Sequence, residues 1–180
     1  MEEEKLQPVK ISAVVRAVKE QGVCMLIDRD DEYYLVTGNF ILKLRRKDMW
    51  RIQCKLEIEK RNVYMGHTKE AGWVQTTTEP KCAEVVEKYI SWIDRAAGIP
   101  LLSPTGVAVT MYNDIEMDGQ LYAGADGFVL IRGDYLDMIP GKPELVRLED
   151  YVIVNDTHVI TTMLDDAWQD NPYIRKTGEG

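Results

Sequence analysis

The sequence predicts an α+β fold built from two repeated units, each a helix followed by antiparallel strands. Residues 34–44 are matched by residues 122–132, and both segments carry a Tyr and a Phe six positions apart. An amphipathic stretch precedes each copy, and an Asp-Met pair, a β-branched stretch and a Trp follow it. A repeat of this length is typical of one supersecondary unit used twice. Such duplication favours a protein that binds or assembles over one organised around a catalytic pocket. The matched pairs are Tyr34 and Tyr122, Phe40 and Phe128, Asp48-Met49 and Asp137-Met138, and Trp73 and Trp168.

The first unit is predicted over residues 1–79. Apolar side chains three and four positions apart in 11–18 predict a short helix that Gly22 ends. Residues 23–27 and 33–44 predict a hairpin, in which 33–44 is one long strand or a bent strand pair. Residues 46–54 predict a short basic helix. A second hairpin is predicted from 56–58 and 63–65, and residues 66–81 are expected to connect the two units.

The second unit is predicted over residues 80–170. An apolar stripe predicts a helix over 82–97, which Gly98 and Pro100 end. Strands are predicted at 107–112 and 120–132, a short helix at 135–139, and a final hairpin over 151–163 around Asn155-Asp156. Residues 171–180 are predicted to form a mobile tail.

Composition indicates a globular chain of 180 residues, of which 45% are hydrophobic. No apolar run approaches the roughly 20 residues that span a bilayer, so no membrane partner and a cytoplasmic location are predicted. The three cysteines, at 24, 54 and 82, form no close pair, and we expect buried apolar side chains rather than a disulfide or a metal motif. His67 and His158 are expected to be structural. Because no catalytic or phosphate-binding motif is present, we predict no enzyme activity, no cofactor and no metal site.

Charge is strongly segregated along this chain of net charge −8. Residues 43–61 carry +5, whereas 1–42 carry −3, 62–110 carry −1 and 111–180 carry −9. One short basic segment in an acidic protein indicates either a surface that faces phosphates or an acidic face that meets a basic partner. Charges that simply keep a small domain soluble are the third explanation. Aromatic residues among the basic ones favour nucleic acid, although Tyr34 and Phe40 are expected in the core on one strand face. The candidate DNA-binding or partner-binding residues are Arg16, Lys19, Arg45, Arg46, Lys47, Trp50 and Arg51.

Two segments carry a resemblance to a known superfamily. Ala125-Asp126-Gly127-Phe128, followed by Val129-Leu130, is similar to the Thr-Asp-Gly-His-Arg-Leu-Ala strand of bacterial sliding clamps. Residues 46–52 are similar to the short basic helix that clamps place after their first hairpin. With the repeated order of elements, the chain therefore resembles the DNA sliding-clamp superfamily over roughly residues 8–168.

The resemblance implies a non-catalytic protein of DNA metabolism that binds duplex DNA or DNA-processing proteins such as a polymerase or nuclease. In clamps, Lys and Arg on inward helices contact phosphates without sequence preference. Each copy here is shorter than a typical clamp domain, and two copies cannot close a ring, so encircling DNA would require a homo-oligomer. The second copy also lacks the basic helix face. A compact, diverged relative of this kind is expected from a phage or mobile element.

Two other interpretations follow from the carboxylates. Residues 111–180 could present an acidic partner face, with Asp134, Asp137 and Glu144, to a nuclease or host-defence effector, as an inhibitor or DNA mimic does. Clustered carboxylates could instead hold a divalent cation for a metal-dependent enzyme, for which Asp156, Asp165 and Asp166 are the candidates. The simpler explanation of Asp156, Asp165 and Asp166 is that the end of the last hairpin and the tail are acidic without binding a cation.

Overall fold

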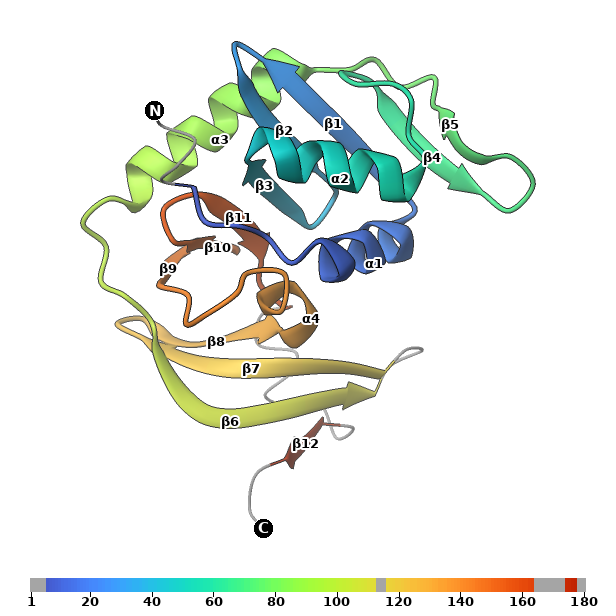
Figure 1. Ribbon diagram of the computed structural model, residues 1–180. Helices are drawn as coiled ribbons and strands as arrows, with labels where there is room; N and C mark the ends of the chain where they lie inside the picture. Colours follow the sequence, from blue (N-terminus) through green and yellow to red (C-terminus); the bar gives the residue numbers. More distant parts are fainter. Residues whose placement is uncertain (1–5, 113–115, 164–173, 178–180) are drawn as a thin grey trace.

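Four helices and two antiparallel sheets make up the part of the chain that the computed structural model describes, residues 6–112, 116–163 and 174–177 (Figure 1). The α+β class is therefore as predicted. The first half contains α1 (Ile11–Gln21), β1 (Val23–Arg29), β2 (Glu32–Val36), β3 (Phe40–Leu44), α2 (Arg46–Leu56), β4 (Tyr64–Thr68) and β5 (Gly72–Gln75). The second half contains α3 (Cys82–Ala96), β6 (Ser103–Tyr112), β7 (Glu116–Gly124), β8 (Gly127–Arg132), α4 (Gly133–Leu136), β9 (Leu145–Leu148), β10 (Tyr151–Val154), β11 (His158–Thr161) and β12 (Ile174–Thr177).

The large sheet joins strands from both halves of the chain. Its order is β5-β4-β1-β2-β3-β11-β10-β9, and the small sheet has the order β12-β6-β7-β8. The two halves meet where β3 pairs with β11, with Phe40 opposite Ile160 and Leu42 opposite His158. The predicted boundary between residues 79 and 80 falls in the connection from β5 to α3. The division into two units therefore stays a prediction about sequence, since one continuous sheet contains strands from each.

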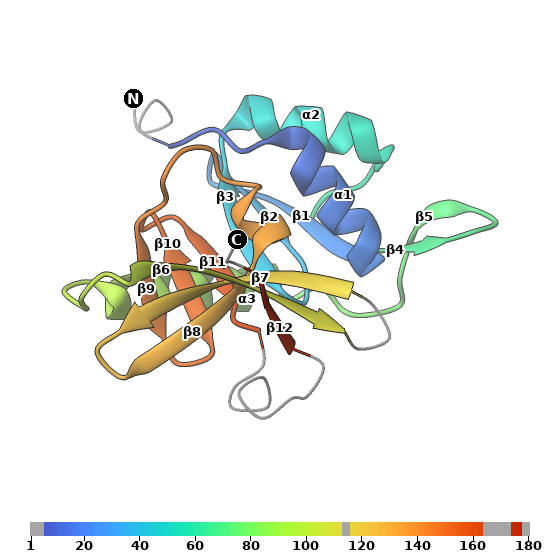
Figure 2. The ribbon, with the colours of Figure 1, turned by 90° about the horizontal axis from the view of Figure 1, so that it is seen from below.

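The helices cover the two faces of the large sheet unequally. α1, α2 and α4 lie on one face and α3 lies on the other (Figures 1 and 2). Side chains alternate along each strand, so Leu26 and Leu35 enter the core beneath α1 and α2, whereas Ile27 and Tyr34 enter the core beneath α3. Among the residues that the structure describes, no helix is both long and apolar enough to cross a bilayer.

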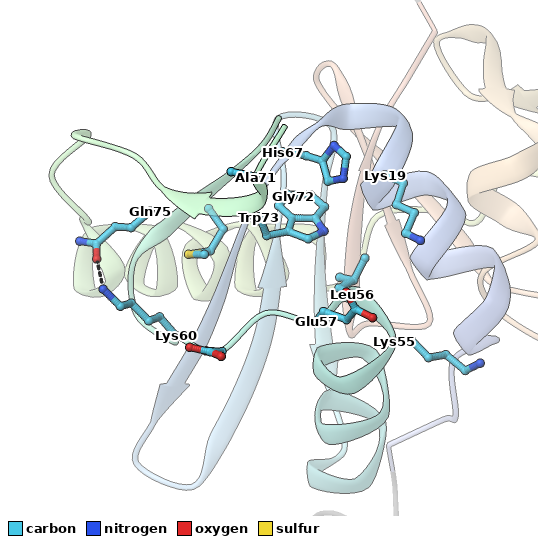
Figure 3. A pocket seen from close by; sticks show the side chains of 12 residues that line it. Lys19, Lys55, Leu56, Glu57, Lys60, His67, Ala71, Gly72, Trp73 and Gln75 are labelled. Carbon is cyan, nitrogen blue, oxygen red and sulfur yellow. Dashed lines mark hydrogen bonds between the residues drawn. The ribbon is translucent and has the colours of Figure 1, made fainter. Parts of the chain in front are cut away.

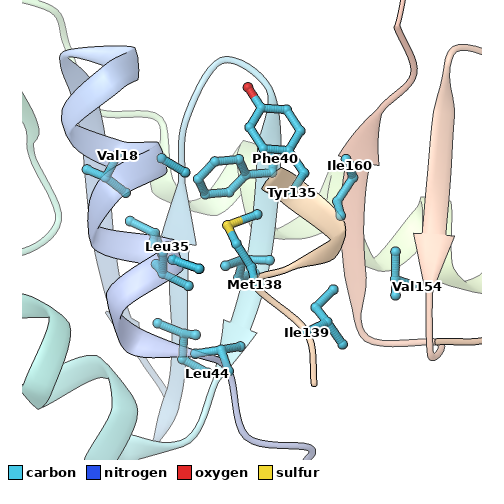
Figure 4. Close-up of a cluster of buried hydrophobic side chains, with 14 of the residues drawn as sticks. Val18, Leu35, Phe40, Leu44, Tyr135, Met138, Ile139, Val154 and Ile160 are labelled. Atoms are coloured by element: carbon cyan, nitrogen blue, oxygen red, sulfur yellow. The ribbon is translucent and has the colours of Figure 1, made fainter. Parts of the chain in front are cut away.

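The core beneath α1 and α4 is the larger one and contains residues from both halves of the chain. Figure 4 shows Val18 of α1, Leu35 and Phe40 of the central strands, and Met138 packed together. Polar contacts tie the same elements at the rim: Gln21 Nε2 donates to the Tyr135 hydroxyl at 2.8 Å, and Asn39 Nδ2 donates to Gln21 Oε1 at 2.7 Å. These contacts fix α1 against α4, which comes from the other half.

The order of elements recurs, but the two series have different surroundings. A helix, a three-stranded meander and a second helix occur as α1, β1–β3 and α2, and again as α3, β6–β8 and α4. The first meander lies in the middle of the large sheet, whereas the second lies in the small sheet. Phe40 is buried, but its counterpart Phe128 is 54% exposed. The matched positions therefore do not share one packing environment.

Most predicted elements are present, and the errors lie at hairpins. The prediction of a hairpin from 56–58 and 63–65 is wrong, because Leu56 is buried as the last residue of α2. The hairpin is instead β4 with β5, which begins at Tyr64 and extends into the segment 66–81 expected to be a connection, where Gly72 adopts a positive φ of 67°. The strand predicted over 120–132 is two strands, β7 and β8, joined at Ala125-Asp126. β9 was not predicted.

Two expectations about individual side chains also need correction. Tyr34 and Phe40 are buried as expected, but they enter different cores because Thr37 to Asn39 form a turn that separates β2 from β3. Cys24 is buried, and burial raises the pKa of its thiol to about 12. Cys54, however, is exposed and Cys82 is half-buried. Cys54 lies four residues after Trp50, on the outward side of α2.

His158 is a polar residue inside the large core. Its side chain is fully buried, and neither ring nitrogen has a hydrogen-bond partner among the described residues. Across the strands it faces Leu42 and Val154. Burial in this apolar setting lowers the pKa of His158 to about 4, so the ring is neutral near pH 7. The expected structural role is consistent with this position.

The predicted tail falls partly outside the described residues. Residues 171–173 and 178–180 are not described, whereas Ile174–Thr177 form β12, which pairs with β6 at the edge of the small sheet. Trp168 and the aspartates at 165, 166 and 170 also lie outside the described residues.

Candidate nucleic-acid interface

α1 and α2 pack beside each other on the large sheet and present an outer surface (Figure 2). In α1, Ala13, Val14, Ala17 and Val18 are buried. The helical period therefore places Arg16 and Lys19 on the outward side, where both are exposed. Gly22 adopts a left-handed φ of 69° and ends α1, so that β1 can start at once beneath it.

α2 follows the same rule with a more basic outer face. Asp48, Met49, Ile52 and Leu56 are its buried residues. Between them, Trp50, Arg51, Cys54 and Lys55 are exposed and Gln53 is half-buried. Trp50 is 65% exposed, more than any other large apolar side chain in the described part of the chain. We call the exposed basic side chains of the two helices, together with Trp50, the basic surface, and it comprises Arg16, Lys19, Arg46, Lys47, Trp50, Arg51 and Lys55.

Arg45 differs from the other predicted binding residues. Its Nε donates to Asp48 Oδ2 at 2.6 Å, and the Asp48 side chain is nearly inaccessible to solvent. A buried carboxylate needs this partner, because an unpaired buried charge is strongly destabilising. Arg45 therefore stabilises the start of α2 and is not part of the basic surface, whereas Arg16, Lys19, Arg46, Lys47, Trp50 and Arg51 are.

Sequence reasoning missed Lys55. The helix was expected to end at Cys54, but it continues to Leu56. Lys47, Arg51 and Lys55 are four residues apart and form one row on the outer face of α2. The same period that identified the buried side of α2 could have identified this lysine.

Within α1 and α2, few carboxylates lie among the basic side chains. Glu20 of α1 is held by Arg132 at 3.2 Å, and Asp48 is held by Arg45. Glu57 and Glu59 follow the end of α2 and are exposed. The outer face of the two helices is thus strongly positive on an acidic protein, which attracts anions and repels other acidic surfaces.

A cavity of about 480 Å³ opens beside the end of α2, between α1 and the β4–β5 hairpin (Figure 3). Lys19 and Lys55 reach it from the two helices, and Trp73 of β5 forms part of its wall. The Trp73 ring meets the His67 ring edge to face, with centroids 5.1 Å apart. The cavity therefore joins cationic and aromatic groups. Its residues are Lys19, Lys55, Leu56, Glu57, Glu59, Lys60, Met65, His67, Ala71, Gly72, Trp73 and Gln75.

A shallower hollow of about 540 Å³ shares Glu57 and Glu59 with this cavity. Trp50, Cys54 and Arg61 line it, together with Gln53 and Ile58. Arg61 is bound there, because its Nε donates to Gln53 Oε1 at 2.9 Å and its Nη1 pairs with Asp28 Oδ2 at 2.5 Å. Trp50 therefore stands beside a concave surface rather than on a flat one.

The predicted acidic partner face is divided. Asp134 and Asp137 line a cavity of about 350 Å³ with Glu20 and Asp118. Arg132 neutralises part of it, since its Nη2 pairs with Asp134 Oδ2 at 2.5 Å. Glu144 does not line this cavity and lies just before β9, where it is exposed. Asp137 is also exposed.

No cluster of three His, Cys, Asp or Glu side chains that could hold a metal ion occurs in the described ranges. Of the carboxylates considered for a cation site, only Asp156 lies in those ranges, and it is exposed in the turn between β10 and β11. Asp165 and Asp166 lie outside them, so that interpretation stays a prediction.

Comparison with known proteins gives no relative from which a role could be transferred. No protein-family model, curated protein or solved structure matches the chain. The function is therefore inferred from the basic surface and the cavity beside it.

Proposed function

We propose that this chain is a non-catalytic protein of DNA metabolism, and that its basic surface binds duplex DNA through the phosphates. The proposal rests on the basic side chains that α1 and α2 expose next to each other. Arg16 and Lys19 of α1 and Arg46, Lys47, Arg51 and Lys55 of α2 are all exposed, and the two helices that carry them lie side by side on the large sheet. Cationic side chains on adjacent helices are the usual source of sequence-independent affinity for a duplex.

The contrast with the rest of the molecule supports nucleic acid as the ligand. The chain has a net charge of −8, yet the exposed charged side chains of α2 are all basic. α3, on the opposite face of the large sheet, mixes Glu84, Glu87 and Asp94 with its basic residues. A protein of this charge distribution would approach DNA with one face only.

Trp50 supplies the apolar part of the contact. An exposed indole costs free energy in water and is enriched at binding surfaces. Arg46 precedes it by one helical turn and Arg51 follows it directly, so the ring would pack on sugar or base while its neighbours contact phosphates. The likeness to sliding clamps fits such a role, and a ring around DNA would require several copies of this chain. A polymerase or nuclease could use the same surface.

The proposal predicts DNA binding with a steep dependence on salt. The six cations of the basic surface would give a slope of log K against log salt of about −3.6 to −5.4, if four to six of them contact phosphates. Fluorescence anisotropy of a labelled 20-base-pair duplex, titrated with the chain from 0.05 to 0.3 M salt, measures this slope. Absence of binding at 0.05 M salt, or binding that salt leaves unchanged, would remove the proposal.

A further inference from the structure

We infer that the cavity between α1, α2 and the β4–β5 hairpin binds one nucleotide of a single strand, with the base against Trp73 and the phosphate between Lys19 and Lys55. The inference rests on the proposed function and deepens it, because it assigns the chain to junctions between duplex and single strand rather than to continuous duplex.

The size and shape of the cavity fit this ligand. A volume of about 480 Å³ lies within the range of small-molecule pockets, roughly 300–1,000 Å³. In Figure 3 the Trp73 side chain lies between Lys19 and Lys55 on one side and Lys60 with Gln75 on the other. A base stacked on the indole would therefore have its phosphate toward the two helices.

The charged groups of the cavity differ in how they are engaged. Lys60 Nζ donates to Gln75 Oε1 at 2.8 Å, which fixes that side of the cavity. Lys19 and Lys55 have no ion-pair or hydrogen-bond partner within the described part of the chain, and neither do the carboxylates of Glu57 and Glu59. Lys19 and Lys55 can therefore bind a phosphate group. The carboxylates can accept hydrogen bonds from N–H groups on the edge of a base, such as the ring N–H of thymine or uracil.

The residues around Trp73 hold its ring in a fixed position, so that a base could stack on it. It is half-buried and packs against the large core, while His67 meets its ring at an interplanar angle of 71°. A ring held on one side by the protein loses little conformational freedom when a base stacks on it. Stacking of this kind contributes about 1–3 kcal/mol per base and tolerates any sequence.

The cavity is continuous with the basic surface. Lys19 and Lys55 belong to both, at the ends of their helices nearest the β4–β5 hairpin. A duplex lying along α1 and α2 would therefore direct an unpaired end toward Trp73. A continuous duplex offers no unstacked base to the cavity, which is why the two ligands can be distinguished.

The test compares Trp73→Leu with the matched control Trp73→Phe, which keeps an aromatic ring. Anisotropy titrations use three labelled probes: a blunt duplex, the same duplex with a four-thymidine overhang, and one with a four-uridine overhang. We expect the wild-type chain to prefer the overhangs. Trp73→Leu should lose about 5- to 100-fold in affinity for them and change duplex affinity less than 2-fold, whereas Trp73→Phe should stay within about 3-fold.

The outcomes separate the two proposals. Duplex binding without any effect of Trp73→Leu on the overhang probes overturns the nucleotide cavity and leaves the proposed function intact. Failure of the wild-type chain to bind any probe overturns both. A loss confined to the thymidine overhang assigns DNA, and a loss confined to uridine assigns RNA. If Trp73→Leu does not fold, the indole N–H resonance of Trp73 in the wild-type chain decides: it must shift with the overhang probe and not with the blunt duplex.

Discussion

Replacing Arg46, Lys47 and Arg51 by Glu is expected to lower the affinity for duplex DNA by about 10²- to 10³-fold at 0.1 M salt. All three side chains are exposed on α2, and none of them belongs to the buried residues of that helix, so the replacements should not disturb the core. Each lost phosphate contact removes about 0.9 from the salt slope, so three contacts account for a change of this size at 0.1 M. Arg45 is left unchanged in this variant, because its loss would leave Asp48 buried without its partner.

The matched control reverses three cations on the other face of the large sheet. Lys81, Lys88 and Arg95 lie at the start of α3 and along it, and changing them to Glu alters the net charge by the same amount. If binding came only from overall charge, both triple variants would lose affinity equally. Equal losses in the two variants, measured by anisotropy with the same duplex, would contradict a binding surface on α1 and α2.

Replacing His158 by Leu is expected to change how the free energy of unfolding depends on pH. The unfolded His158 takes up a proton near pH 6.5, whereas burial holds the folded pKa near 4. Below pH 6.5 the unfolded state therefore binds more protons, and the folded state loses about 3 kcal/mol between pH 6.5 and 4 from this group alone. His158→Leu removes this loss. It also removes a buried imidazole without hydrogen bonds, so the variant should be at least as stable at pH 7.

Urea unfolding at pH 7, 5.5 and 4 measures the effect for both proteins. The two curves of unfolding free energy should separate steadily as the pH falls, with most of the difference present at pH 4.

Glu32 also makes the free energy of unfolding depend on pH, but at lower pH than His158. Burial acts to raise the pKa of Glu32, but hydrogen bonds from Lys43 and Tyr34 outweigh it and lower the pKa. Its stabilising contribution is present above pH 4.5 and is lost as the pH falls below that value. Identical pH dependence in wild type and His158→Leu would contradict the buried, neutral imidazole.

Local patterns predicted the helices and most of the strands, because one buried face leaves a clear period in the sequence. The row Ile11, Val14 and Val18 identified α1, and the apolar residues among Arg and Lys identified α2. The pairing of β3 with β11 could not be predicted this way. It joins Leu42 to His158 over more than a hundred residues, and no local period specifies which buried strand lies beside which.

The candidate site was predicted in part for the same reason. Exposed basic residues on a helix follow from its buried residues, so Arg16, Lys19, Arg46, Lys47 and Arg51 could be named from the sequence. The position of α1 beside α2, and of Trp73 beside Lys19, depends on tertiary packing. The pairing of Arg45 with Asp48 could not be predicted, because a basic residue that neutralises a buried carboxylate has the same sequence signature as one that faces solvent.

Mapping the DNA contact by NMR tests the central claim most directly. Backbone amide shifts of the labelled 180-residue chain are compared with and without a 12-base-pair duplex at low salt. The account predicts that the largest changes lie in Ile11–Gln21 and Arg46–Leu56, while Cys82–Ala96 stays unchanged. Changes centred on α3 or on the acidic residues Asp134, Asp137 and Glu144, or no changes anywhere, would contradict it.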